Sequence, residues 1–366
     1  MRNTPAPPRP ARRRHIVVSP FGEREDPYYW LRDDTRSDPE ILAHLAAENA
    51  YTEAMLEHCR DEIAQLYEEI AGRLEPDAAS VPVRFRGYWY RARYRPGSEH
   101  PLILRRRDAP DAEERVLLDC EALAAQHAFF QLGDHEPSPD NELLAYTEDT
   151  IGRRQYRLRV RHIASGELLP DIIENVESCI AWTDDSRRIL YVEKDPVTLL
   201  GRRVRCHTLG TPVAEDEVLY EEHDESFDLS VSRSKSERYL FIGAESTTSS
   251  EWRYAAADDP ALRFEVFAAR EAHHEYQLEH IENRFIVRTN WLAENFRIVS
   301  VAPGEEGEHA RWRDVVPHDT QVFVQDFEAF RTFLAVSERS AGLSRLRIQP
   351  WDGPAHYVAA DDPAYT

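Results

Sequence analysis

A turn and a strand that recur about every 45 to 50 residues constrain the fold of this chain more than any other feature. Ser138–Tyr146 reads SPDNELLAY, Thr183–Tyr191 repeats it as TDDSRRILY, and Ser232–Phe241 repeats it with one residue more. Weaker copies start at Glu282 and Ala329, so the five starts are separated by 45, 49, 50 and 47 residues. Periods of about 40–50 residues with several strands each are typical of propeller blades. The repeat therefore predicts a β-propeller, and a β-sandwich with coincidentally similar turns is the alternative.

The expected fold class is all-β, a β-propeller with an α-helical N-terminal extension. Residues 1–20 are expected to form a disordered basic tail, residues 21–75 the helical extension, and residues 76–366 the propeller. At the observed period the propeller has about six to seven four-stranded blades. We expect it to be incomplete and to lack its final strands.

A strong helix start lies within the extension. Ser37 and Glu40 have the spacing of a capping box around Asp38, and Pro39 suits the first turn. Gly72 is placed to end the helical region. Between these signals the apolar residues recur mostly in steps of three and four, which predicts one apolar face: Leu42, Leu45, Leu56, Cys59, Ile63, Leu66 and Ile70.

This pattern fits either one helix or two helices broken near Ala50. An apolar face must pack against something. We expect its stripe, which includes Leu45, Leu56, Ile63 and Ile70, to be exposed in the isolated chain.

Net charge, hydropathy and cysteine spacing indicate which partners and which cellular location to expect. The chain has 45 Lys and Arg against 67 Asp and Glu, a formal net charge of −22, so we expect no nucleic-acid partner. Five arginines in the first 14 residues are not followed by an apolar h-region, and no window approaches the ~20 apolar residues of a membrane span. We therefore expect no membrane partner and a cytoplasmic protein. The cysteines form no CxxC pair, which favours reduced thiols: Cys59, Cys120, Cys179 and Cys206.

Several segments resemble one family of enzymes. Asp26–Asp34, which reads DPYYWLRDD, resembles the opening signature of the prolyl oligopeptidase family of serine peptidases, in the form closest to oligopeptidase B. His274–Tyr276 and Phe285–Asn290, which read HEY and FIVRTN, are similar to a stretch of oligopeptidase B propellers. The blade start Ser138–Asp140 and the closing Asp361–Tyr365 also resemble the family. The resemblance covers the chain from about residue 20.

The resemblance implies two domains with different roles. In the family an α/β-hydrolase domain, placed mostly after the propeller, carries the Ser, Asp and His, while the propeller caps that site and admits only short peptides. Oligopeptidase B cleaves after Arg or Lys, and an acidic interior would suit such basic peptides. The hydrolase domain is absent from this chain, which stops at Thr366, so we expect it as a partner in cis or in trans.

No motif of the chain supplies a catalytic centre. None of its 14 glycines opens the G-x-S-x-G turn of a hydrolase nucleophile. The nearest match, Gly342-Leu343-Ser344, continues into the strand-like Arg345-Leu346. We assign no catalytic residue, no metal ligand and no cofactor site to this chain.

Three groups of residues suggest a functional site and are better explained by structure. Five residues suggest zinc, but the second histidine falls six residues after the first instead of four, so turns and blade edges explain them better: His273, His274, Glu275, Glu279 and His280. Adjacent carboxylates occur four times, and turn hydrogen bonding explains them best: Asp33-Asp34, Asp184-Asp185, Asp258-Asp259 and Asp361-Asp362. The run Arg105–Arg107 is expected to be a solvated strand end.

We therefore predict the N-terminal extension and incomplete, substrate-gating propeller of an oligopeptidase B-like serine peptidase. The alternative from another class is a stand-alone propeller that serves as an interaction scaffold, which requires closed blades because open edges aggregate. A glycosidase sited in the funnel is a third possibility, and it requires two carboxylates facing each other across the axis.

Overall fold

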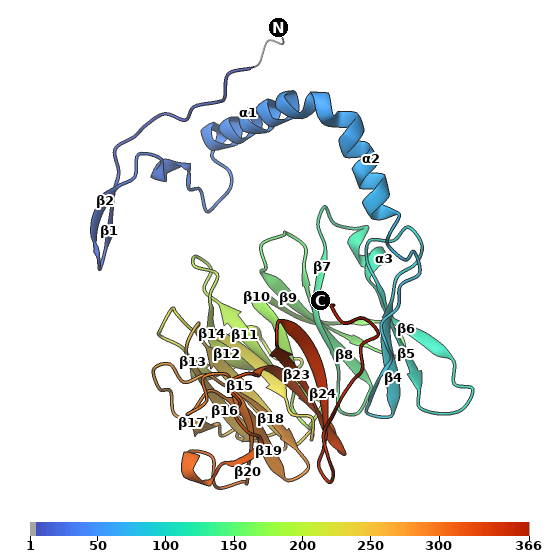
Figure 1. Cartoon of the computed structure of the whole chain (residues 1–366). Coiled ribbons are helices and arrows are strands. Elements are labelled where there is room, and N and C mark those ends of the chain that lie inside the picture. The colour runs from blue at the N-terminus through green and yellow to red at the C-terminus, as the bar shows by residue number, and fades with distance from the viewer. Residues whose placement is uncertain (1–4, 366) are drawn as a thin grey trace. The chain divides into compact units, whose positions relative to one another are not determined.

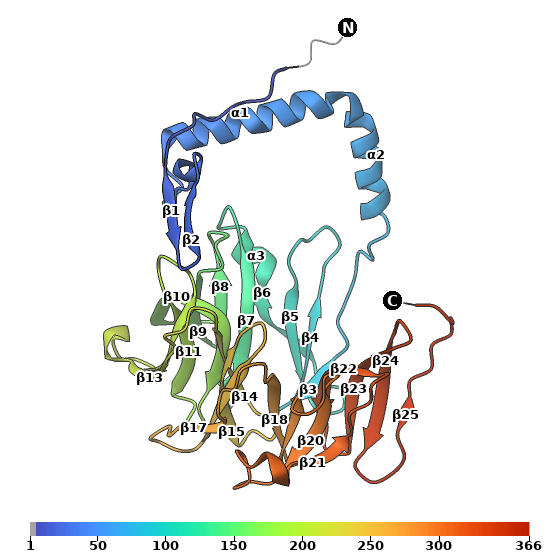
Figure 2. The ribbon, with the colours of Figure 1, turned by 60° about the vertical axis from the view of Figure 1, so that its left-hand side comes forward.

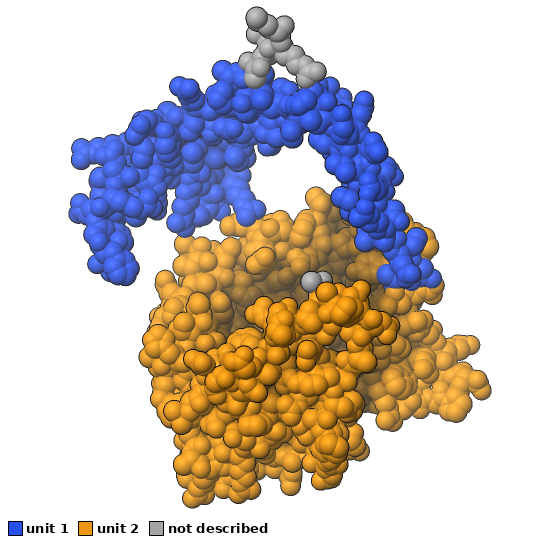
Figure 3. Space-filling view, viewed as in Figure 1, with its two compact units in different colours: residues 1–78 blue, residues 79–366 orange. Residues whose placement is uncertain are grey.

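The computed structural model describes residues 5–365 and divides the chain into two compact units, residues 1–78 and residues 79–366 (Figure 3). Residues 1–4 of the expected basic tail, and Thr366, lie outside the described residues. Among the helices of the described part, none combines the length and the apolar character that a membrane span requires.

The first unit begins with a short hairpin. Strand β1 (Ile16–Ser19) pairs antiparallel with β2 (Gly22–Glu25). Strand β1 therefore falls within the segment that was expected to be a disordered tail. The 3₁₀ helix η1 (Tyr29–Leu31) follows, and the indole Nε1 of Trp30 donates a 2.8 Å hydrogen bond to the carbonyl of Ala11.

Two helices with a short link make up the rest of this unit (Figure 1). Helix α1 (Pro39–Leu56) passes through the 3₁₀ helix η2 (Glu57–Cys59) into α2 (Arg60–Ala71). The break therefore lies at η2 and not near Ala50. Gly72 follows the last helical residue, as expected, and its N–H donates to the carbonyls of α2.

The start of α1 differs from the expected capping box. The Asp38 carboxylate accepts the backbone N–H groups of Glu40 at 2.8 Å and Ile41 at 3.3 Å, so Asp38 is the N-cap. The prediction that Ser37 caps the helix is wrong, because its hydroxyl hydrogen-bonds to that of Thr35 at 2.7 Å.

The expected exposure of the apolar stripe is confirmed. Its four residues are 52%, 47%, 48% and 61% exposed: Leu45, Leu56, Ile63 and Ile70.

The second unit consists of antiparallel blades that follow one another in chain order (Figure 2). The first strands of several successive blades contact each other, which places them nearest the common axis. The described residues form six blades. Blade 1 comprises β3 (Val83–Phe85), β4 (Tyr88–Arg93), β5 (Leu102–Arg107) and β6 (Glu114–Asp119). Blades 2 and 3 comprise β7 (Gln131–Pro137), β8 (Leu143–Asp149), β9 (Tyr156–His162), β10 (Leu168–Trp182), β11 (Arg188–Lys194), β12 (Gly201–Thr208) and β13 (Glu217–Glu221).

The remaining blades follow in chain order. Blade 4 comprises β14 (Asp228–Arg233), β15 (Tyr239–Glu245), β16 (Ser250–Ala256) and β17 (Glu265–Ala268). Blade 5 comprises β18 (Tyr276–Ile281), β19 (Arg284–Thr289), β20 (Arg297–Val301) and β21 (Arg313–Val316). Blade 6 comprises β22 (Phe323–Ala329), β23 (Phe333–Ser340), β24 (Leu343–Pro350) and the two-residue β25 (His356–Tyr357). Short helices occupy three connections: α3 (Cys120–Ala124), η3 (Val213–Glu215) and η4 (His309–Arg311).

One long strand serves two blades. The first part of β10 pairs with β9 between Leu168 and Val176, and its second part pairs with β11 between Val176 and Trp182. Blades 2 and 3 are therefore hydrogen-bonded into one seven-stranded sheet. The all-β blade architecture that the repeat predicts is confirmed, and the β-sandwich alternative is wrong.

The repeat itself is a six-residue turn between the first and second strands of blades 2, 3 and 4. The hydroxyl of Ser138 accepts the N–H of Leu143 at 2.9 Å, and that of Ser234 accepts the N–H of Tyr239 at 3.0 Å. The third copy therefore starts at Ser234, not Ser232, and is no longer than the others. In each turn the fourth residue has a positive φ: Asn141, Ser186 and Glu237.

The core lies between neighbouring blades. Between blades 3 and 4, for example, Leu190 and Val204 pack with Leu229, Leu240 and Ile242, and all five are at most 6% exposed. Burial of this kind of apolar area is the main stabilising term for such a fold.

Candidate functional site at the channel mouth

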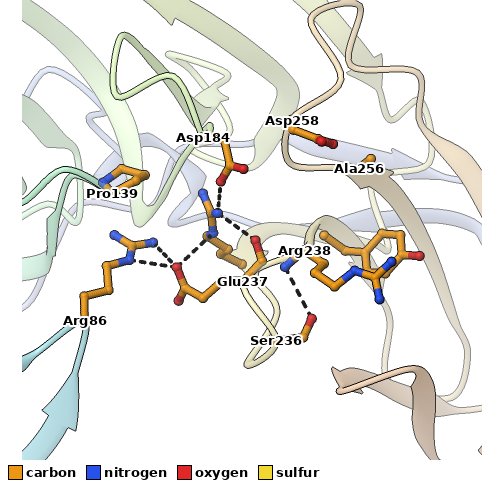
Figure 4. A pocket seen from close by; sticks show the side chains of 10 residues that line it. Arg86, Pro139, Asp184, Ser236, Glu237, Arg238, Ala256 and Asp258 are labelled. Atoms are coloured by element: carbon orange, nitrogen blue, oxygen red, sulfur yellow. Dashed lines mark hydrogen bonds and ion pairs between the residues drawn. The ribbon is translucent and has the colours of Figure 1, made fainter.

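The turns that join the first and second strands meet at one end of the propeller, because each blade starts with its inner strand. Here they line a cavity of about 470 Å³ (Figure 4). Its walls come from the turns of blades 1 to 4 and from the β16–β17 connection. We call this cavity, together with Arg86, Asp184, Arg233 and Glu237, the channel mouth.

An ion pair joins opposite blades at the channel mouth. Arg86, in the tight turn of blade 1, donates from Nε to Oε2 of Glu237 on blade 4 at 2.7 Å. Its Nη1 donates to the carbonyl of Pro137 on blade 2 at 2.7 Å. The Arg86 side chain is 10% exposed, so the guanidinium is largely withdrawn from water. A charge at this depth depends on its partners, because an unpaired buried charge is strongly unfavourable.

A second arginine ties blade 3 to the same turn. Arg233, at the end of β14, donates from Nη1 to the carbonyl of Trp182 at 2.9 Å and pairs with Asp184. It also donates from Nη2 to the carbonyl of Glu237 at 2.6 Å, and its Nε lies 3.4 Å from the Glu237 carboxylate. Glu237 thus lies between two guanidinium groups, as Figure 4 shows.

The same turn of blade 4 reaches blades 5 and 6. The backbone N–H of Lys235 donates to Glu279 on β18 at 2.9 Å, and the Lys235 ammonium pairs with Glu328 on β22. Residues 233–239 therefore contact blades 1, 3, 5 and 6.

Two carboxyl groups near this turn have raised pKa values. Burial raises the pKa of Glu136, on β7, to about 8, and the neighbouring Asp134 carboxylate adds to the rise. Burial also raises the pKa of Glu279 to about 7, although its carboxylate accepts backbone N–H groups from Lys235 and His280. Both acids therefore change charge within the neutral range. The arrangement can bind the charged groups of a ligand.

The paired carboxylates divide their roles as turns predict. One member of each pair accepts a backbone N–H group within its own turn: Asp33, Asp185, Asp259 and Asp362. Hydrogen bonds, the Thr35 hydroxyl first, hold the pKa of Asp33 well below its usual range. The first members Asp184 and Asp258 are different, because they line the channel mouth cavity. No sequence pattern indicates that second role.

The histidine-rich stretch is split between the two ends of β18. His273, His274 and Glu275 precede the strand, and Glu279 and His280 lie at its other end, beside the turn of blade 4. The stretch therefore forms no single cluster. Burial, reinforced by the nearby His309, lowers the pKa of His274 to about 4.

His280 makes a serine–histidine contact that is not a catalytic triad. Its Nδ1 lies 2.7 Å from the hydroxyl of Ser236, but its buried Nε2 has no hydrogen-bond partner among the described residues. A triad requires a carboxylate that orients the imidazole through that second nitrogen. Burial lowers the pKa of His280 to about 4, so the ring is neutral at pH 7.

The other sequence candidates lie in ordinary structure. Gly342 has φ +82° in the β23–β24 hairpin, and Ser344 pairs with Arg339 in that ladder, so no nucleophile elbow forms there. The expected basic strand end lies on β5, where Arg105 stacks over the ring of Tyr88 at 4.2 Å.

Known proteins resemble this chain over almost its whole length. Residues 7–364 match the family described as "Prolyl oligopeptidase, N-terminal beta-propeller domain". Dipeptidyl aminopeptidase BI of Pseudoxanthomonas mexicana is 45% identical over 377 residues, which cover 98% of this chain and 52% of that protein.

Solved structures show the same architecture. Oligopeptidase B of Leishmania major superposes with a TM-score of 0.90 at 25% identity, over 98% of this chain and 54% of that one. Oligopeptidase B of Trypanosoma brucei, in a closed form with covalently bound antipain, gives 0.87 at 27% identity, over 98% and 54%. The chain spans about half the length of the curated relatives it matches.

Proposed function

Because this chain belongs to the prolyl oligopeptidase family of serine peptidases as its N-terminal β-propeller domain, we propose that it controls which peptides reach a hydrolase domain. The hydrolase domain would be joined in cis or bound in trans, and it would supply the Ser, Asp and His for acyl transfer. The chain itself has no G-x-S-x-G motif.

The observation that carries this proposal is the channel mouth. A single turn of blade 4 contacts four other blades through charged groups, and Arg86 and Glu237 lie across the axis from each other. These contacts border a cavity of about 470 Å³, a size that suits a small ligand or a short peptide segment. The mouth therefore supports exclusion of folded proteins.

We propose short basic peptides as the substrates, with cleavage after Arg or Lys. The net charge of −22 favours cationic ligands electrostatically. The similarity to two oligopeptidase B structures supports the same preference.

A second candidate rests on a different observation. The 45% identical relative is named a dipeptidyl aminopeptidase, which favours release of dipeptides from a free N-terminus. A peptide with a blocked N-terminus and an internal Arg discriminates between the two activities. Its cleavage supports the oligopeptidase reading, whereas cleavage only of the unblocked peptide supports the aminopeptidase.

The exposed stripe of α1 and α2 supports a hydrolase partner, because an unpartnered apolar face favours a binding role. A stand-alone scaffold would instead remain monomeric and would not associate with a hydrolase domain. The thiols are unpaired in the described residues, which suits the cytoplasmic location that we propose.

The assembled peptidase tests the gating role. R86Q combined with E237Q should raise kcat/KM for a long unfolded polypeptide by about tenfold and leave a short peptide nearly unchanged. R84Q is the matched control, since Arg84 pairs with Asp108 inside blade 1. An unchanged ratio between the long and short substrates would refute control of access at this end of the channel.

A further inference from the structure

Three potential metal ligands gather on blade 5, away from the channel mouth. Glu271 and His274 lie in the β17–β18 connection, and His309 opens η4 in the β20–β21 connection. One donor atom from each residue lies within 4.8 Å of the other two. The sequence did not indicate this group, because His309 follows His274 by 35 residues and no motif links them.

Two buried nitrogens in this group have no partner. His274 is only 3% exposed, and its Nε2 hydrogen-bonds to the Thr289 hydroxyl at 2.9 Å. Its Nδ1 is buried without a hydrogen bond among the described residues, and so is Nε2 of His309. Buried polar atoms left in this condition are unfavourable and rare. A cation between the two rings would satisfy both lone pairs.

The surroundings hold both rings in place. Thr289 fixes one nitrogen of His274, which is the usual way in which the outer contacts of a metal ligand set its orientation. Trp291 stacks on His309 with ring centroids 4.1 Å apart, and Trp312 meets the same ring edge-on at 4.4 Å. Glu271 is exposed, so its carboxylate can rotate onto an ion bound between the rings.

We propose that Glu271, His274 and His309 form a binding site for a zinc-like divalent transition metal. Two imidazoles and one carboxylate are a ligand set that zinc uses, with a fourth position open to water. Imidazole ligands disfavour Ca²⁺ and Mg²⁺, which prefer oxygen. The bound ion ties the loop before β18 to η4 before β21 and so stiffens one edge of blade 5. This inference is independent of the proposed peptidase function.

Zinc titration of the full chain, first treated with a chelator, tests the site. We expect one equivalent of Zn²⁺ to bind in competition with a chromophoric chelator, and Co²⁺ to give the absorption of a tetrahedral complex. Zinc should also raise the unfolding temperature, while Mg²⁺ should not.

Substitutions that leave the core intact assign the ligands. H309Q and E271Q should each weaken zinc binding by at least about tenfold and reduce the thermal shift. H273N is the matched control, because His273 is exposed, adjacent in sequence and outside the group, and Asn tolerates its positive φ. H274Q is less informative because that ring is buried. Absence of zinc binding in the unsubstituted chain, or equal affinity in H309Q and H273N, would overturn the proposal.

Discussion

Arg86 and Glu237 are 151 residues apart in the chain and lie on the first and fourth blades, yet Arg86 Nε donates to the Glu237 carboxylate at 2.7 Å. Most contacts in a propeller join neighbouring blades, as the core between blades 3 and 4 does. A contact across the axis resists separation of blades that share no sheet. The channel mouth is therefore a point where contacts that stabilise the fold also border the proposed passage.

A double-mutant cycle measures the interaction energy between Arg86 and Glu237. R86Q and E237Q should each lower the free energy of unfolding, and their interaction energy should be about 1 kcal/mol, since the pair is partly shielded from water. Urea unfolding of the four proteins provides the values. R84Q should lower stability by less than about 0.5 kcal/mol, because the Arg84 side chain is 64% exposed. Additive effects of R86Q and E237Q would show that the pair contributes no coupling.

Glu136 should make stability depend on pH. The unfolded chain releases this proton near pH 4.5, whereas burial raises the folded pKa to about 8. Between these values the folded state binds more protons than the unfolded state, so the free energy of unfolding falls as pH rises. Glutamine cannot ionise, so in E136Q the free energy of unfolding does not fall with pH for this reason. At pH 9 E136Q should therefore be more stable than the unsubstituted chain, by on the order of 2 kcal/mol.

At pH 4 the two proteins should be equally stable, because Glu136 is protonated in both states. E142Q, at an exposed position of the same blade, should show no such crossover. A pH-independent difference between E136Q and the unsubstituted chain would contradict the assignment.

The repeat was readable from the sequence because blades 2, 3 and 4 reuse one turn with a Ser or Thr hydroxyl at its start. The start of the third copy of the repeat could not be located from the sequence, since Ser232 and Ser234 both fit the pattern. Only the hydrogen bond from Tyr239 N–H to Ser234 distinguishes them. Likewise, steps of three and four predicted the helical face, but helix periodicity alone did not place the break at η2.

The channel mouth could not be predicted, because its charges lie far apart in the chain. Asp184 was explained by turn chemistry, yet it is Asp185 that accepts the N–H of Arg187 within the turn. This leaves the Asp184 carboxylate free to pair with Arg233, 49 residues away. Pairs at such separations depend on how blades stack, which local sequence patterns do not encode.

A buried histidine joins the outer strands of blades 2 and 3. The Nδ1 of His207 lies 2.8 Å from Asp216, and its Nε2 lies 3.1 Å from Asp171 on β10. All three side chains are at most 3% exposed. H207L leaves two buried carboxylates without this partner and should lower the free energy of unfolding by about 3 kcal/mol.

Urea unfolding checks this value, and H223L is the control. His223 is exposed and should contribute less than about 0.5 kcal/mol. A loss below about 1 kcal/mol in H207L would show that the network does not hold these strands together.

Thiol labelling should distinguish the cysteines by burial. Burial raises the pKa of both Cys120 and Cys206 to about 12, so almost no reactive thiolate exists at pH 8. Cys59 is only partly buried at the end of η2. We expect a thiol reagent to modify Cys59 first in the folded chain and to reach Cys120 and Cys206 only after denaturation. The fast phase should disappear in C59S, and its persistence there would contradict the order.

The apolar stripe on α1 and α2 should dominate the surface hydrophobicity of the isolated chain. Ile63 and Ile70 are 48% and 61% exposed, and they lie on one face of α2, two turns apart. Replacing both with Ser should reduce the fluorescence of a bound hydrophobic dye by about half, because the patch loses two of its four exposed apolar side chains. The free energy of unfolding should change little, since neither residue is buried.

V197S, at a 67% exposed position in the β11–β12 connection, should leave the dye signal nearly unchanged because a single scattered apolar residue forms no patch. Equal signals from all three proteins would mean that the stripe is covered in solution and is not free to bind a partner.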